Sequence, residues 1–157
     1  MSCDGQDIFD AQTTSGHAVI AGFGVPGRAV GDSLSAQNVP FVVIELNPTT
    51  IDRCSHRGVH MIEGDVRNAE TLRRAGIERA SFFAVTVPND QIAMEAVRLA
   101  RELNPTMHIM ARFHFISNGM IAHKLGANEV VIEEQVVAQE FVRLMKKTPA
   151  PELQATA

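Results

Sequence analysis

The fold of this chain is decided by residues 18–27, which read AVIAGFGVPG. A short apolar run ends there in the pattern G-x-G-x-x-G, formed by Gly22, Gly24 and Gly27. The first glycine lets the chain turn sharply off a strand, the second lets the backbone approach a phosphate, and the third lets a helix lie close to that strand. The helix that follows presents free N–H groups and the positive end of its dipole. The motif therefore predicts a strand, a turn and a helix arranged around a pyrophosphate.

The residues after the motif supply the context that a glycine pattern needs. A helical pattern stops at residues 38–40, and the run FVVI at 41–44 then predicts a buried strand. Glu45 ends this strand 18 residues after Gly27, near the spacing of about 20 typical of an acid that binds a ribose. A carboxylate there can accept hydrogen bonds from two ribose hydroxyls and repels a 2′-phosphate, so NADP is disfavoured. The alternative is a chance glycine turn, with Glu45 as a solvated strand end.

Composition and charge restrict the class of protein. The 157 residues suit one domain with a substantial core, and 45% hydrophobic with 20% charged residues is ordinary for a globular protein. The formal net charge of −4 argues against a nucleic-acid-binding protein, which normally presents a basic face. No apolar run approaches the roughly 20 residues of a membrane helix, and the N-terminus lacks the pattern of a secretory signal. We therefore expect a cytoplasmic protein with no direct membrane insertion.

Strand and helix patterns alternate along residues 17–147, which we expect to form one domain. Strands are expected near 17–22, 40–46, 59–63, 81–87, 107–112 and 129–132, and helices near 26–38, 48–57, 68–76, 89–104, 116–126 and 133–147. Repeated βα units predict an α/β fold, a Rossmann-like, doubly wound, parallel six-stranded sheet with helices on both faces. Residues 1–16 and 148–157 lack useful periodicity and are expected to be a flexible N-terminal segment and a flexible tail.

The ends of the expected strands supply the candidate binding residues. Their apolar runs are nearly continuous, as in strands covered on both faces. In such a sheet, ligands bind beyond the carboxyl ends of the strands. This rule selects Gly22–Gly27, Glu45, Gly64-Asp65, Pro88-Asn89-Asp90 and Arg112.

Six segments of the chain, taken together and in order, resemble the TrkA-N domain, the N-lobe of the RCK or KTN regulatory domains of potassium channels and transporters. They are GFGVPG (22–27), VVIELN (42–47), EGDVRNAETLRRAGIERA (63–80), VTVPNDQIAMEAVRLARELNP (85–105), IMARF (109–113) and LGANEVV (125–131). The chain is most similar to the C-terminal cytosolic regulatory domain of Kef-type (YbaL-like) cation:proton antiporters. The resemblance covers roughly residues 17–146.

The resemblance implies a regulatory nucleotide-binding domain and no enzyme. Members of the family bind NAD(H), AMP, ADP or ATP, pair as homodimers and control a membrane-embedded cation transporter or channel, which would place this chain at the inner face of the cell membrane. Carried over to this sequence, the cofactor-binding residues are Gly22, Phe23, Gly24, Val25, Pro26, Gly27, Arg28, Glu45, Leu46, Asn47, Gly64, Asp65, Val66, Val87, Pro88, Asn89 and Arg112.

The family also implies individual roles for some of these residues. Asp65 is expected beside the adenine, Asn89 and Asp90 along the distal half of the ligand, and Arg112 toward phosphate or across the cleft. Many Kef-type relatives carry arginine within the glycine loop where this chain has Val25, and here the arginine is residue 28. The chain is either a separate subunit or a piece of a larger antiporter.

Several residues have a second interpretation that the sequence leaves open. Asp65 is also placed to cap the helix expected near residue 68, and Arg112 to form a surface salt bridge. Arg28 opposes the dipole of its helix unless an anion lies nearby, so phosphate contact and simple exposure both stand. The apolar stripe of helix 133–147 packs either on its own sheet or on a partner subunit. The histidines show no metal-ligand spacing, and we expect no metal site.

Two other functions stay open beside the regulatory one. An NAD-dependent oxidoreductase needs a substrate pocket and a proton donor, whereas this chain has no tyrosine and few residues outside the nucleotide fold. An oligomerisation domain with a degenerate nucleotide site is the other, and the retained Glu45 and glycines argue against it. The residues do not tell which nucleotide, which ion or which sign of regulation is physiological.

Overall fold

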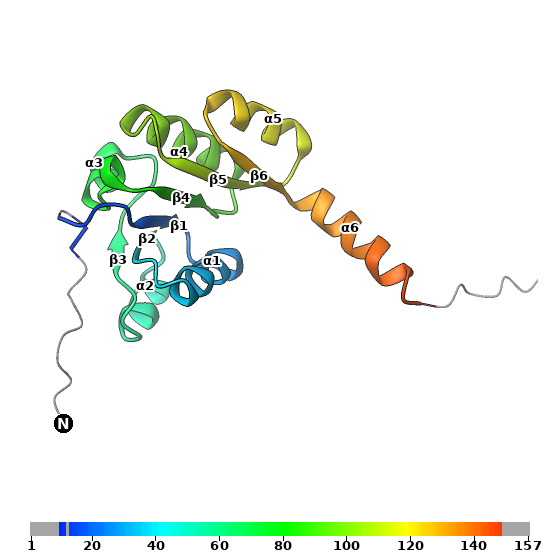
Figure 1. The fold of residues 1–157 in the computed structure, drawn as a ribbon, viewed down its shortest axis with the longest axis horizontal. Helices are drawn as coiled ribbons and strands as arrows, with labels where there is room; N and C mark the ends of the chain where they lie inside the picture. The colour runs from blue at the N-terminus through cyan, green and yellow to red at the C-terminus, as the bar shows by residue number, and fades with distance from the viewer. Residues whose placement is uncertain (1–9, 12, 149–157) are drawn as a thin grey trace, which may run out of the picture.

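A six-stranded, all-parallel sheet forms the centre of the computed structural model, which describes residues 10, 11 and 13–148 (Figure 1). The strands are β1 (Ala18–Ala21), β2 (Phe41–Glu45), β3 (Met61–Glu63), β4 (Phe82–Val85), β5 (His108–Phe113) and β6 (Glu129–Ile132). Their order in the sheet is β3-β2-β1-β4-β5-β6. The chain builds outward from β1 to one edge, returns to place β4 on the other side of β1, and builds outward again. This order confirms the Rossmann-like, doubly wound sheet that the sequence predicts.

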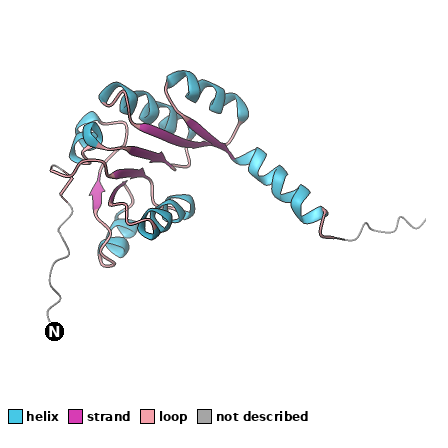
Figure 2. Cartoon of the chain, in the orientation of Figure 1, coloured by secondary structure: helices cyan, strands magenta, loops and turns pink. Residues whose placement is uncertain are grey.

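The strands are connected by helices on both sides of the sheet (Figure 2). These are α1 (Val25–Ala36), α2 (Pro48–Ser55), α3 (Ala69–Arg74), α4 (Asp90–Leu103), α5 (Ile116–Leu125) and α6 (Glu133–Met145), with a short 3₁₀ helix, η1 (Ile77–Arg79). Each observed end of a strand or α-helix lies within two residues of the expected one. The 3₁₀ helix was not expected. Among the residues described, no helix is both long and apolar enough to span a bilayer.

Three asparagines start helices directly beyond strands at the carboxyl edge of the sheet. The Oδ1 atom of Asn47 accepts hydrogen bonds from two backbone N–H groups of α2, Asn68 does the same for α3, and Asn89 caps α4. Asparagine suits this position because its side-chain oxygen satisfies an N–H that lacks a partner in the helix. The N-termini of α2, α3 and α4 therefore all open at the edge where ligands bind in this fold.

Two apolar layers hold the helices to the sheet. Ile20 and Val43 point to one face of the sheet, where they pack with Phe23 and Cys54 beneath α1 and α2. The alternate residues of the same strands, such as Val42, point to the opposite face, which α3, α4 and α5 cover. Strands β1 and β2 are thus buried on both faces, as their continuous apolar runs predict.

The far half of the sheet is covered on one face. Along β5 every second side chain is buried and the others, including Met110 and Arg112, are partly exposed. Val131 on β6 is 42% exposed. The helix that follows β6 does not return over this face, because α6 extends away from the body of the molecule and none of its residues is buried (Figure 1). The expectation that the strand near 129–132 is covered on both faces is therefore wrong, and so is the interpretation that helix 133–147 packs on its own sheet.

Packing begins before residue 17. Ala11 is buried, and its carbonyl accepts a hydrogen bond from Nη2 of Arg79 at 2.5 Å. The Gly16 N–H donates to the carbonyl of Arg79 at 2.9 Å. Part of the segment expected to be flexible is thus held against η1. The rest of that segment, residues 1–9 and 12, and residues 149–157 of the expected tail lie outside the described residues.

A buried asparagine gives the fold its first test. Nδ2 of Asn104 donates to the carbonyls of Ile77 and Ala80, and its Oδ1 accepts from the N–H groups of Thr106 and Met107. Asn104→Ala should lower the free energy of unfolding by about 2–3 kcal/mol, because these backbone groups would be buried without partners. Urea unfolding followed by circular dichroism measures this loss.

The matched control is Arg98→Ala on α4, the helix that ends directly before Asn104. Arg98 forms an exposed ion pair with Glu102, and exposed pairs contribute less than about 1 kcal/mol. Equal losses in the two variants would show that the Asn104 hydrogen bonds do not connect α4, η1 and β5 as described.

Candidate functional site

The three glycines of the turn after β1 differ in why they are glycine. Gly22 has a φ of +84°, which favours glycine, and a Cβ atom on Gly27 would lie 2.2 Å from the carbonyl oxygen of Gly22. The fold itself therefore needs both. Gly24 has a φ of −71°, and a Cβ atom there would meet nothing within 4 Å. The absent side chain of Gly24 leaves open space in front of the turn, where the motif predicts a phosphate.

Thr86 directly follows β4, the strand beside β1, and contacts this turn. It was not among the site residues expected from the sequence. Its Oγ1 lies 2.8 Å from the carbonyl oxygen of Gly22 and 3.0 Å from that of Ala21, within hydrogen-bond distance of both. The available signal was the one hydroxyl residue within the apolar run FFAVTV at 82–87. Thr86 thereby fixes the carbonyl against which Gly27 packs.

Glu45 holds the other side of the turn. Its Oε2 accepts a hydrogen bond from the Phe23 N–H at 2.9 Å, and its Oε1 accepts from the N–H groups of Leu46 and Asn47 at 2.8 and 3.0 Å. A carboxylate offers about four acceptor positions. One position on Oε2 is left for a ribose hydroxyl, and a second ribose bond would have to replace one of these backbone donors.

A cavity of about 190 Å³, here called the Glu45 cavity, opens at the carboxyl edge of the sheet. Its walls are mainly apolar, and the carboxylate residues Glu45 and Asp65 both line it. This combination suits a flat apolar base joined to a polar sugar. The lining residues are Gly22, Ile44, Glu45, Leu46, Gly64, Asp65, Val66, Val87, Pro88, Asn89 and Ile92.

Asp65 is engaged by a neighbouring arginine. Its carboxylate accepts from the backbone N–H of Arg67 and forms an ion pair with the guanidinium at 2.7 Å. The side-chain hydrogen bond from Arg67 is the main cause that lowers the pKa of Asp65 below its usual value. The interpretation that Asp65 caps the following helix is wrong, because Asn68 occupies that position.

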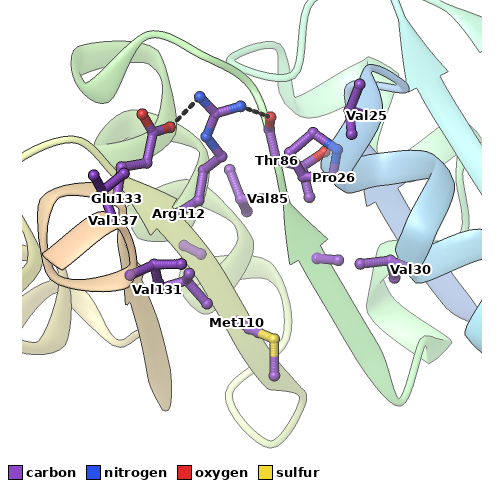
Figure 3. A pocket seen from close by; sticks show the side chains of 13 residues that line it. Val25, Pro26, Val30, Val85, Thr86, Met110, Arg112, Val131, Glu133 and Val137 are labelled. Carbon is purple, nitrogen blue, oxygen red and sulfur yellow. Dashed lines mark hydrogen bonds and ion pairs between the residues drawn. The ribbon is translucent and has the colours of Figure 1, made fainter. Parts of the chain in front are cut away.

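A second cavity of about 480 Å³, here called the β5 cavity, lies over the uncovered half of the sheet (Figure 3). The first turn of α1 forms one wall and the first turn of α6 the opposite one, with β4, β5 and β6 as the floor. Its lining is largely apolar: Val25, Pro26, Val30, Ala84, Val85, Thr86, Met110, Ala111, Arg112, Val131, Glu133, Val136 and Val137. The glycine turn therefore separates the two cavities.

Arg112 crosses the mouth of the β5 cavity (Figure 3). Its Nη1 donates to the Thr86 carbonyl at 3.3 Å, and its Nη2 forms an ion pair with Glu133 at the start of α6. The side chain is 19% exposed, so the pair is partly buried. The second interpretation of Arg112, as a partner in an ion pair, is thus the arrangement observed.

Asp90 lines neither cavity. It accepts hydrogen bonds from the backbone N–H of His114, from Nδ1 of His114 at 2.8 Å and from Nδ2 of Asn118 at 2.5 Å. Burial tends to raise the pKa of Asp90, but the hydrogen bonds from Asn118 and His114 lower it below its usual value overall. Asp90 joins α4 to β5 and α5, and the expectation that it borders the distal half of the ligand stays a prediction.

Some of the other expected site residues line neither cavity, and the rest line one of the two. Phe23 contributes its N–H to Glu45 while its ring is buried in the core. Gly24, Gly27, Arg28 and Asn47 line neither cavity. Arg28 is exposed on the first turn of α1. The remaining expected residues are divided between the Glu45 cavity and, for Val25, Pro26 and Arg112, the β5 cavity.

The family model of the TrkA-N domain matches residues 18–133. The chain belongs to the TrkA-N domain family. The resemblance drawn from its motifs is thereby confirmed.

Solved and curated relatives agree with this assignment. The crystal structure of the TrkA-N domain of the inner membrane protein YbaL from Escherichia coli is 34% identical, with a TM-score of 0.81, over 85% of this chain and 98% of that one. YbaL of E. coli K12, described as a cation/proton antiporter, is 36% identical over 87% of this chain and 25% of its own length. The chain thus spans about a quarter of that relative. The Kef CTD of Shewanella denitrificans in its AMP-bound form is 25% identical, with a TM-score of 0.70, over 85% of this chain and 82% of that one.

Gly27 is in close contact with backbone and Gly24 is not, and this difference tests how the glycine turn of this TrkA-N domain is built. Gly27→Ala should lower the free energy of unfolding by about 1–3 kcal/mol, because the added Cβ collides with backbone that cannot retreat. Gly24→Ala should change it by less than about 1 kcal/mol, because space is open there. Thermal unfolding of both variants measures the difference, and similar losses would mean that the turn is not built as described.

Proposed function

We propose that this TrkA-N domain binds an adenine nucleotide or NAD(H) in the Glu45 cavity and thereby regulates a cation transporter or channel. The observation that carries the proposal is the Glu45 carboxylate. It is fixed by three backbone N–H groups beside the glycine turn and keeps one acceptor position toward the cavity. The AMP-bound form of a Kef relative supports the same class of ligand.

Each part of an adenine nucleotide has a counterpart in the cavity. The apolar side chains of Val66, Val87 and Ile92 suit the adenine ring. Asp65 would accept a hydrogen bond from the amino group of the base, and Glu45 one from a ribose hydroxyl. The open space before Gly24, at the N-terminus of α1, would receive the first phosphate.

Glu45 also sets the selectivity that we propose. A 2′-phosphate would place negative charge against a carboxylate that backbone hydrogen bonds hold in position. AMP, ADP, ATP and NAD(H) share the free ribose hydroxyls and are all acceptable, whereas NADP is disfavoured.

We propose binding without catalysis. The two carboxylates of the Glu45 cavity are already engaged with backbone N–H groups or with Arg67, and the chain contains no tyrosine to serve as a proton donor. Hydride transfer from NADH to any substrate of a carbonyl panel would favour the oxidoreductase alternative instead.

The regulated partner is proposed from the relatives. A chain 36% identical to part of a protein described as a cation/proton antiporter would act beside a membrane-embedded cation pathway, at its cytoplasmic face. Regulation requires that the nucleotide bind one state of the assembly better than another, since equal binding shifts no equilibrium.

We further propose that the domain acts as a homodimer joined through α6. The helix carries an exposed apolar stripe that includes Val137, Phe141 and Leu144, and none of its residues is buried against the sheet of its own chain. The β5 cavity is an apolar face with no helix of its own over it. In a dimer, the α6 stripe of one copy would pack on the uncovered apolar face of the other. Exposed apolar area of this kind normally marks an interface.

Calorimetric titration with AMP tests the ligand. Glu45→Gln should weaken AMP binding on the order of ten- to a hundredfold, because the hydrogen bond to a charged acceptor is lost and the turn is held less firmly. It should also narrow the preference for NAD over NADP.

The matched control is Glu63→Gln. Glu63 is the register partner of Glu45 on the neighbouring strand and is exposed. The Glu63 variant should bind AMP as the unaltered domain does. Absence of binding to AMP, ADP, ATP, NAD and NADH would contradict the proposed ligand and favour the oligomerisation domain.

Sedimentation velocity tests the dimer. Phe141→Glu places a charge in the apolar stripe of α6 and should weaken self-association at least tenfold, because an unpaired charge is costly to bury. Gln139→Glu adds the same charge to the opposite side of the helix and should leave the dimer intact. A monomeric unaltered domain, or equal effects of the two variants, would rule out association through this stripe.

A further inference from the structure

An unbroken polar path runs from the glycine turn to the start of α6. The Thr86 hydroxyl contacts the Gly22 carbonyl at 2.8 Å, and the Thr86 carbonyl accepts from Nη1 of Arg112 at 3.3 Å. Arg112 then forms an ion pair with Glu133, the first residue of α6 (Figure 3). The path crosses β1, β4 and β5 at their carboxyl ends. Arg112 therefore connects Thr86, which contacts the glycine turn, with the first residue of α6.

Arg112 and Glu133 are the charged residues of an otherwise neutral cavity. Among the described residues that line the β5 cavity, Arg112 is the one cation and Glu133 the one acid. The guanidinium is 19% exposed, which limits how well water can replace a lost partner. A cation in such surroundings needs an anion close by. In the structure, Glu133 supplies it.

Glu133 has a second partner within reach. Its Oε2 lies 3.5 Å from Nε2 of His114, and Nδ1 of the same imidazole is held by Asp90 at 2.8 Å. The imidazole therefore stands between two carboxylates, one on α4 and one on α6. If Arg112 were taken by another anion, Glu133 could move toward His114 without leaving its place at the start of the helix.

We propose that Glu133 is a built-in competitor for the nucleotide phosphate. The inference rests on the proposed nucleotide site. A phosphate of the bound nucleotide that passes the first turn of α1 enters the β5 cavity beside Val25 and Pro26 and meets Arg112. It replaces the Glu133 carboxylate there, and the released carboxylate turns to His114, whose Nε2 donates to it when the imidazole is protonated. Binding of the nucleotide thereby changes the ion-pair partner of the first residue of α6.

The exchange has two measurable consequences. Glu133 weakens the binding of phosphorylated ligands, because each must first break the ion pair. In return, a phosphorylated ligand must loosen the first turn of α6, because coupling between two sites is reciprocal. Adenosine has no phosphate, so Glu133 should not weaken its binding, and its binding should not loosen the first turn of α6.

Calorimetry with ADP and adenosine tests the first consequence. Glu133→Gln should bind ADP about three- to tenfold more tightly than the unaltered domain, while adenosine affinity changes less than about twofold. Glu134→Gln is the matched control, since it removes the same charge from the same helical turn. Glu134 contacts the Ile116 N–H and lines neither cavity, so both affinities should stay within about twofold.

Hydrogen exchange at residues 136–138 tests the second consequence, because their N–H groups donate to the carbonyls of residues 132–134 at the start of α6. ADP should raise exchange there about twofold or more in the unaltered domain and in Glu134→Gln, and should leave Glu133→Gln unchanged. Unchanged ADP affinity in Glu133→Gln would overturn the competitor role while leaving nucleotide binding intact. If the unaltered domain bound neither ADP nor adenosine, the proposed function would fail and the competitor role with it. Tighter ADP binding in both variants would show a general charge effect and would also overturn it.

Discussion

The contact between Gly27 and the carbonyl of Gly22 is the constraint on which the site depends. With 2.2 Å between that oxygen and a Cβ built on Gly27, no other residue fits without moving backbone. The contact seats α1 against the end of β1, and two polar groups keep it there. Thr86 holds the Gly22 carbonyl from β4, and Glu45 holds the Phe23 N–H from β2. The turn is thus fixed by both neighbours of β1, and the α1 N-terminus opens toward the edge of the sheet as a consequence.

Sequence periodicity and spacing were sufficient for the parts of this architecture that are local. Glycines with positive φ at 58, 76 and 126 and the asparagine cap at 47 are local signals, so the element boundaries near them followed from the sequence. The cap at Asn68 did not, since Asp65 was considered for that position. The spacing of Glu45 from the glycine turn also reflects one βαβ unit. Asp65 and Asp90 were harder to tell apart, because both simply follow a strand. Their partners, Arg67 in one case and His114 with Asn118 in the other, separate them only in three dimensions.

Thr86, Glu133 and the course of α6 show where sequence reasoning stops. The role of Thr86 depends on carbonyls 64 and 65 residues away along the chain. The role of Glu133 depends on an arginine from another strand. An apolar stripe looks the same in sequence whether its helix packs on its own sheet or on another molecule, so periodicity alone gave both possibilities for α6. The alternation of burial along β5 excludes packing of α6 on its own sheet, since a helix returning over the sheet would have buried Met110 and Val131. Packing on another molecule is what we propose.

The uncovered face and the polar path are connected by the way in which α6 begins. β6 ends at Ile132 and α6 starts at Glu133, with no linker between them. No flexible linker therefore separates the sheet from the first turn of α6. The first residue is also the one that contacts Arg112. A charge exchange at Arg112 therefore acts on the helix that carries the apolar stripe. Under the two proposals above, loss of the Arg112–Glu133 ion pair would release the first residue of the helix through which the dimer is proposed to form.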